Sequence, residues 1–409
     1  MSSWNRSCSG RQVRRALAVL LVVGLLAACD PTPDKDVFYT DPVDLSGAPG
    51  SVIRQRPSTF TLDPVGQAPR PGVDARQLVY RTTGARGQAL AVSGTLLVPT
   101  TPWLIGDRPL VAYAPGTRGL GDECAPSYTL SQGTDYEGLF MSTLLDQGWA
   151  VAVTDYEGLG MPGQHTYVVG QSEGRAMLDL ARAALGTRAG GLRSGSPVGL
   201  VGYSQGGGAA GWAAQLESTY APELNVRGTA AGGIPGDLAR VGEFLEGSLF
   251  AAFALMASIG YDAAYPELDL EDFLNAEGQA LLADAADTCL VSVDGIGTLL
   301  DTALSSRHDY THTDPLADPA WQARFAENRL GQARPAAPVL QYHGVVDEIV
   351  EFDQAADLRR AWCNRGATVT WATLPGEHLL GMVEGFPLVV PWLQARFAGI
   401  PTVGNCWAP

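Results

Sequence analysis

Basic residues are scarce in this chain of 409 residues, which carries 27 Lys and Arg against 43 Asp and Glu and has a net charge of −16. Four of the arginines lie in the first 28 residues, which contain no acid, so the remaining chain is more acidic still. Because phosphate affinity comes from Lys and Arg, this balance argues against nucleic acid as a partner. Internal repeats and low-complexity tracts are also lacking, and 46% of the residues are hydrophobic, which excludes a disordered chain.

A membrane-spanning run is missing from the N-terminus. The apolar stretch 16–28 has 13 residues, which is too short to cross a bilayer as a stable helix. It follows four arginines and ends in Leu-Ala-Ala directly before Cys29. A basic region, a short apolar region and small residues are typical of a secretory signal, here 1–28, and the Cys resembles that of a bacterial lipobox. We therefore predict export and lipid anchoring at Cys29 on the extracytoplasmic side of the cell membrane; a secretory signal without lipidation is the alternative.

Cysteine is rare as well, and none forms a C-x-x-C pair, which disfavours a zinc site. Cys8 leaves with the signal and Cys29 would carry lipid. The four others are Cys124, Cys289, Cys363 and Cys406. In an exported protein an even number of widely spaced cysteines indicates two disulfides, for which sequence alone allows three pairings.

What the chain does contain is an alternation of apolar strand-like runs and helical segments. The expected strands are 77–80, 90–98, 109–114, 149–155, 197–203, 226–234, 337–342 and 368–374, and the expected helices are 139–147, 173–185 and 205–217. This alternation predicts an α/β fold with a mostly parallel sheet and helices on both faces.

One stretch of about a hundred residues interrupts the alternation without a strand pattern, and we interpret it as an inserted helical cap over 237–334. A second domain without a catalytic role is the alternative. The core then consists of 51–236 and 335–409. Residues 29–50 are predicted to form a tether, exposed over 30–36, where two prolines occur.

The chemistry centres on Ser204 in the sequence Gly202-Tyr203-Ser204-Gln205-Gly206, which matches G-x-S-x-G. The bare pattern is weak, but an apolar strand precedes it and a helix of small residues follows it. That context predicts a nucleophile elbow, a strained strand–turn–helix that exposes the serine hydroxyl at a helix N-terminus.

A serine needs a base, and only five histidines are present. In α/β-hydrolases the acid and then the His follow the Ser in the chain, each after a later strand. Asp347 and His378 occupy those positions, with Glu348 and Asp353 as alternative acids. His343 is interpreted as a packed residue.

The spacing of His308 and His312 resembles a metal pair, but the residues between them are poor helix formers and no third group of ligands supports it. We therefore predict neither metal nor cofactor. For the oxyanion hole we expect the backbone amides of Gln205 and Thr117, with Gly116 as the alternative to Thr117.

These residues together resemble the secretory lipase family of fungi and actinobacteria. The matching segments are 38–39, 93–95, 98–99, 113–117, 124–127, 155–160, 202–207, 232–235, 344–347 and 376–378. The resemblance implies an α/β-hydrolase fold with a helical cap, and a triad of Ser204, Asp347 and His378. It also implies disulfides Cys124–Cys289 and Cys363–Cys406.

The predicted function is that of a lipid-anchored serine carboxylester hydrolase, a lipase or esterase, whose substrate is an acyl ester of a lipid. Two alternatives remain open. One is another acyl-group reaction on the same triad, by an acyltransferase or a peptidase. The other is a lipid-anchored binding protein with an inactive hydrolase fold.

Overall fold

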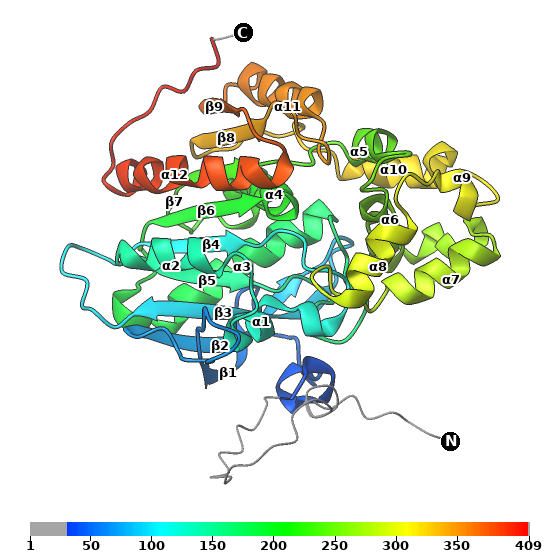
Figure 1. The fold of residues 1–409 in the computed structure, drawn as a ribbon. Coiled ribbons are helices and arrows are strands. Elements are labelled where there is room, and N and C mark those ends of the chain that lie inside the picture. The colour runs from blue at the N-terminus through cyan, green and yellow to red at the C-terminus, as the bar shows by residue number, and fades with distance from the viewer. Residues whose placement is uncertain (1–30, 408–409) are drawn as a thin grey trace, which may run out of the picture.

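Nine strands form one sheet in the computed structural model, which describes residues 31–407 (Figure 1). The predicted signal 1–28 and Cys29 lie outside the described residues. The sheet order is β1-β2-β3-β5-β4-β6-β7-β8-β9. The strands are β1 (Val52–Ser58), β2 (Val73–Thr83), β3 (Ala89–Pro99), β4 (Leu110–Ala114), β5 (Ala150–Thr154), β6 (Val198–Tyr203), β7 (Val226–Gly232), β8 (Val339–Gly344) and β9 (Val369–Leu374).

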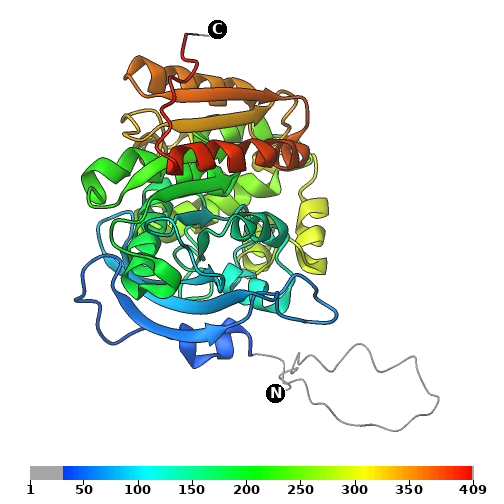
Figure 2. The ribbon, with the colours of Figure 1, turned by 90° about the vertical axis from the view of Figure 1, so that its left-hand side faces the viewer.

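The sheet is antiparallel at one edge and parallel elsewhere. β1, β2, β3 and β5 pair antiparallel, whereas β5, β4, β6, β7, β8 and β9 pair parallel. Figure 2 shows the twist that accumulates from β1 and β2 at the bottom to β8 and β9 at the top. The prediction of a mostly parallel sheet in an α/β-hydrolase fold is confirmed.

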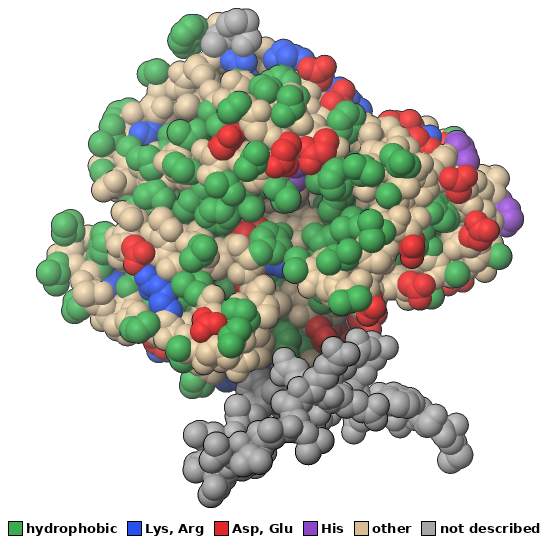
Figure 3. All heavy atoms as spheres, viewed as in Figure 1, with side chains coloured by type: hydrophobic (Ala, Val, Ile, Leu, Met, Phe, Trp, Pro, Cys, Tyr) green, Lys and Arg blue, Asp and Glu red, His purple; other side chains and the backbone are tan. Residues whose placement is uncertain are grey.

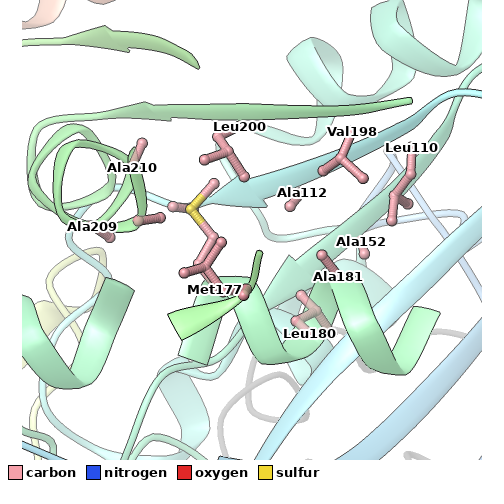
Figure 4. Packing of buried hydrophobic residues seen from close by; sticks show 14 of the residues in the cluster. Leu110, Ala112, Ala152, Met177, Leu180, Ala181, Val198, Leu200, Ala209 and Ala210 are labelled. Carbon is pink, nitrogen blue, oxygen red and sulfur yellow. The ribbon is translucent and has the colours of Figure 1, made fainter. Parts of the chain in front are cut away.

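Helices cover both faces of the sheet because its central strands are buried on both sides. In β6, Val198 and Leu200 pack against one set of helices, while Val201 and Tyr203 contact the other set. The first face carries α3 (Gly170–Thr187), α4 (Gln205–Tyr220) and α11 (Phe352–Asn364). The second face carries α1 (Pro126–Gln132), α2 (Gly138–Asp146) and α12 (His378–Phe397). Figure 4 shows the first of these layers, with Met177 and Leu180 of α3 facing the strands.

The chain between β7 and β8 forms a group of helices beside the ends of the strands, at the right of Figure 1. They are α5 (Leu238–Leu245), α6 (Ala252–Ala264), α7 (Ala276–Ala285), α8 (Val293–Asp301), α9 (Arg307–Tyr310) and α10 (Pro319–Glu327). Buried aromatic side chains of this group, among them Tyr261, Tyr265, Trp321 and Phe325, form a hydrophobic cluster together with residues 167–169 of the sheet domain. It occupies the range in which the sequence predicts a cap, and we refer to it as the cap.

Two disulfides join distant parts of the chain. Cys124 is bonded to Cys289, which fastens the cap to the loop that precedes α1. Cys363 of α11 is bonded to Cys406, which holds the C-terminal segment against the core. These are the pairings that the family resemblance implies.

The exposed tether predicted over 30–36 is wrong in part, because Pro33 and Asp36 are buried while Asp34 and Lys35 are exposed. Pro33–Lys35 and Val37–Tyr39 form two 3₁₀ turns against the core. Phe38 and Tyr39 are buried, and the Tyr39 hydroxyl lies 2.9 Å from Ser127 Oγ. Asp36 pairs with Arg56 of β1 at 2.6 Å, and the Arg56 guanidinium lies over the Phe38 ring. Burying the two aromatic rings removes apolar surface from water, and this stabilises the packed turns relative to an exposed, flexible segment. Within residues 31–407, no helix has the length and apolar character needed to cross a bilayer.

Candidate active site

Ser204 lies in a sharp turn between β6 and α4. Its backbone has φ 59° and ψ −123°, a strained conformation for a residue with a side chain. The glycines on either side are required by space, because a Cβ on Gly202 would lie 2.0 Å from the Gly206 carbonyl oxygen and one on Gly206 would lie 1.9 Å from that of Ala114. The local geometry is that of the predicted strand–turn–helix.

His378 and Asp347 meet Ser204 at the carboxyl ends of the parallel strands. His378 is the first residue of α12, and Asp347 lies in the loop after β8. His378 Nε2 is 2.9 Å from Ser204 Oγ, and His378 Nδ1 is 2.7 Å from Asp347 Oδ2. These distances allow a proton on Nδ1 to be donated to the carboxylate while Nε2 accepts the serine proton. Three residues far apart in the sequence thus form one hydrogen-bonded chain.

The buried carboxylate of Asp347 accepts hydrogen bonds at both of its oxygens. Its Oδ1 accepts the backbone N–H groups of Ile349 (3.0 Å) and Val350 (2.7 Å). Burial alone would raise the pKa of Asp347, but the hydrogen bond and charge of His378 and the backbone donors hold it below its usual value. The carboxylate therefore stays ionised where it can orient an imidazole.

Two of the residues weighed against these, Glu348 and His343, have other partners. The Glu348 carboxylate accepts the backbone N–H of His378 at 3.1 Å, so it contacts the backbone of His378 and not its imidazole ring. His343 is buried, with its Nε2 2.8 Å from the Val350 carbonyl oxygen and 3.3 Å from Asp347 Oδ2. Burial lowers the pKa of His343, which favours the neutral ring of a packed residue.

The loop after β4 brings Thr117 beside the nucleophile. The Gly116 amide already donates to Glu137 Oε1 at 2.9 Å, which removes Gly116 as an oxyanion donor. Among residues 31–407, the amides of Thr117 and Gln205 have no protein acceptor. Both residues line the cavity at Ser204, so these two amides are available to an anionic oxygen.

A buried ion-pair network fixes this loop. Arg118 pairs with Asp135 at 2.9 Å and with Glu137 at 3.3 Å, and it also donates to the Gly116 carbonyl oxygen. The Tyr136 hydroxyl donates to the Thr117 carbonyl oxygen at 2.8 Å. Sequence reasoning missed this network, since its acids lie about 20 residues after the loop and no pattern links them.

An apolar cavity of about 190 Å³ extends from Ser204 and His378 into the cap. Six of the side chains that line it on the cap side are Leu238, Val241, Phe253, Leu274, Leu316 and Phe325. Figure 3 shows hydrophobic side chains gathered on the face seen in Figure 1. Leu379 and Leu380 of α12 and Val293 and Ile296 of α8 are among the exposed hydrophobic residues of the protein. The cavity can hold an aliphatic chain with one end at the serine.

The two histidines with metal-like spacing lie in the cap. His308 and His312 are both exposed, and residues 31–407 contain no group of three or more His, Cys, Asp or Glu placed to hold a metal ion.

The stability of the protein is expected to fall as pH rises from about 5 to 8. Burial raises the pKa of Glu173 to about 8, of Glu217 to about 7 and of Asp155 to about 6. Between their ordinary and raised values the folded chain binds protons that the unfolded chain releases, so the free energy of unfolding decreases with pH. His165 acts in the opposite sense, since burial lowers its pKa to about 4 and its contribution is lost below pH 6.5.

Thermal unfolding at fixed ionic strength would measure this profile, with the highest Tm of the range at its acid end, near pH 5. Glu217→Gln removes one titrating group and should flatten the decline between pH 5 and 7. A Tm that rises steadily from pH 5 to 8 would contradict the assignment.

Comparison with known proteins finds similarity to lipases, both in a family model and in individual relatives. The family model described as secretory lipase matches residues 125–405. The secreted triacylglycerol lipase LIP2 of Malassezia furfur is 33% identical over 397 residues, which cover 93% of this chain and 82% of that protein. A probable inactive lipase of Mycobacterium tuberculosis is 33% identical over 384 residues, covering 90% of this chain and 83% of that one.

Among solved structures, lipase A of Candida antarctica in its closed state superimposes with a TM-score of 0.82 and 28% identity. The match covers 93% of this chain and 90% of that chain. The similarity therefore includes the cap as well as the sheet.

Proposed function

The chain belongs to the secretory lipase family and is a carboxylic ester hydrolase, and from this premise we propose that it cleaves acyl esters of lipids through Ser204, His378 and Asp347. The observation that supports this most is the chain of two hydrogen bonds, 2.9 Å and 2.7 Å long, from Ser204 Oγ through His378 to Asp347 at the end of an apolar cavity. A serine in this setting is a nucleophile for carbonyl carbon.

In the proposed reaction His378 Nε2 takes the Ser204 proton as Oγ attacks the ester carbonyl. The amides of Thr117 and Gln205 stabilise the oxyanion, and His378 then returns the proton to the leaving alcohol. Asp347 holds Nδ1–H in place and stabilises the imidazolium. Water, deprotonated by His378, hydrolyses the acyl-enzyme and releases the acid.

The cap is proposed to hold the acyl chain. The cavity is lined mostly by aliphatic and aromatic side chains of α5, α6 and the later cap segments, with Glu246 and Arg307 among the polar exceptions, and it begins at Ser204. Burying an alkyl chain there contributes roughly 0.8 kcal/mol per methylene. This role would make 237–334 part of the substrate site rather than a separate structural domain.

A fluorophosphonate probe tests the proposal directly. We expect one adduct on Ser204, identified by mass spectrometry, together with hydrolysis of p-nitrophenyl esters from acetate to palmitate. Adding an alcohol acceptor shows whether acyl transfer competes with hydrolysis. A protein that takes no label and cleaves no ester would instead be a binding protein, an outcome that the relative described as inactive makes worth testing.

The membrane anchor is a further part of the proposal. Cys29 follows Leu-Ala-Ala at the end of the apolar segment, and a diacylated Cys would hold the protein at the membrane surface. Cys29→Ser should move the protein from the membrane pellet to the soluble fraction, whereas Cys8→Ser, upstream of the predicted cut, should not. Fractionation of Cys29→Ser with the membrane would show that the anchor is wrong.

A further inference from the structure

The short segment His165–Val168 contacts both residues that carry the oxyanion amides. The Tyr167 hydroxyl lies 2.8 Å from Thr117 Oγ1, and His165 Nε2 lies 3.0 Å from Gln205 Nε2. His165 and Tyr167 are buried. The segment is also held from the cap side, since a Cβ on Gly260 of α6 would lie 2.4 Å from the Tyr167 nitrogen. The two oxyanion residues, 88 positions apart, thus share one support.

The hydrogen-bond directions at Gln205 follow from its neighbours. His165 Nδ1 is 2.8 Å from the Glu157 carbonyl oxygen, which can only accept, so Nδ1 carries the proton and Nε2 is a bare acceptor. Gln205 therefore donates one amide hydrogen to His165 Nε2. Its other amide hydrogen goes to Glu173 Oε1 at 2.7 Å. The side chain of the residue after the nucleophile is fixed at both of its donors.

Glu173 connects this amide to the segment. Its Oε1 also accepts the backbone N–H of Val168 at 2.9 Å. Val168 has φ 54°, a left-handed conformation that a β-branched residue rarely adopts, so its neighbours must hold it there. Glu173 is 1% exposed and the triad does not use it.

We propose that Glu173, His165 and Tyr167 are positioning residues that hold the backbone amides of Gln205 and Thr117 toward the oxyanion. The inference rests on the proposed function, because it presumes that Ser204 attacks an ester. Oxyanion donors act in the transition state and not on the bound ester, so loosening them lowers kcat and leaves KM nearly unchanged.

The test compares Tyr167→Phe, Glu173→Ala and Glu173→Gln with wild type on p-nitrophenyl butyrate, with rates normalised to sites labelled by the fluorophosphonate. We expect kcat to fall about tenfold in Tyr167→Phe and about 10- to 100-fold in Glu173→Ala, with KM within about twofold. Glu173→Gln retains an oxygen that can accept both N–H groups, so it should stay within about threefold of wild type. The affinity of an alkyl trifluoromethyl ketone, which forms a tetrahedral adduct, should fall in proportion to kcat/KM.

Tyr80→Phe is the matched control. Its hydroxyl is equally buried and hydrogen-bonded, to Thr154 Oγ1 at 2.8 Å and to the Ala176 carbonyl oxygen at 3.0 Å, but it contacts neither oxyanion residue. Its loss should lower Tm without changing kcat. Wild-type kcat per labelled site in both Tyr167→Phe and Glu173→Ala would overturn the positioning role while leaving the triad intact. A wild-type protein that neither takes the label nor cleaves the ester would contradict the proposed function, and the positioning role with it.

Discussion

Replacing Ser204 with alanine is expected to lower kcat for p-nitrophenyl butyrate by about 10⁴- to 10⁶-fold. The substitution removes the hydroxyl whose oxygen lies 2.9 Å from His378 Nε2, so no acyl-enzyme can form. The cavity and the two oxyanion amides remain, and these account for any residual rate above that of water. Steady-state kinetics with burst titration of the wild type would measure the loss.

Ser258→Ala provides the control for this loss. Ser258 also lines the cavity, but its hydroxyl donates to the Ala254 carbonyl oxygen within α6 and is not near a base. We expect its kcat within about twofold of wild type. Substantial ester hydrolysis by Ser204→Ala would show that another group is the nucleophile.

Asp347→Asn should have the second largest effect, a fall in kcat of about 10⁴-fold with little change in fold. The amide of Asn can donate to Nδ1, which moves the imidazole proton to Nε2. His378 then presents an N–H to Ser204 Oγ instead of a lone pair and cannot take its proton. The measurement is kcat at saturating ester over the accessible pH range.

Glu348→Gln separates the two candidate acids. The Glu348 carboxylate accepts the His378 backbone N–H, and a glutamine oxygen can do the same. Its kcat should stay within about threefold of wild type. If Glu348→Gln were the more damaging of the two substitutions, the acid would have to be reassigned.

The parts of the fold that the sequence predicts are those whose pattern is local. Runs such as Val198–Tyr203 are continuously apolar because both faces of the central strands are buried, and this pattern is visible without coordinates. The glycines around Ser204 are likewise a local steric requirement. The order of nucleophile, acid and base along the chain then follows from strand order.

Other elements depend on tertiary contacts that no local pattern encodes. The sequence of β1, Val52–Ser58, contains two arginines and a proline, which an edge strand tolerates but which do not indicate a strand. Helix α12 contains Pro387 and Pro391, and its packing on the sheet outweighs their unfavourable propensity.

The contacts around the oxyanion residues were equally hidden from sequence reasoning. Glu173 and His165 lie 32 and 40 residues before Gln205, and the chain between them contains Val168 in a left-handed conformation. The sequence signal at Glu173 is an acid at the start of a segment with helical apolar spacing. A carboxylate that becomes buried needs hydrogen-bond donors, but the sequence does not show which residues supply them.

The two 3₁₀ turns between Pro33 and Tyr39 would limit the distance between the enzyme and a bilayer to which Cys29 is anchored. A flexible segment from Cys29 to residue 50 could let the body move several nanometres from the bilayer, but Pro33 is only four positions after Cys29. Fully extended, the four Cα–Cα steps from Cys29 to Pro33 reach about 14 Å. If the cysteine is acylated, the body must therefore rest almost on the headgroups, with Val37, which is 80% exposed, on the adjoining surface. An enzyme held in this way would act on esters at the membrane surface and not on esters dispersed in the surrounding medium.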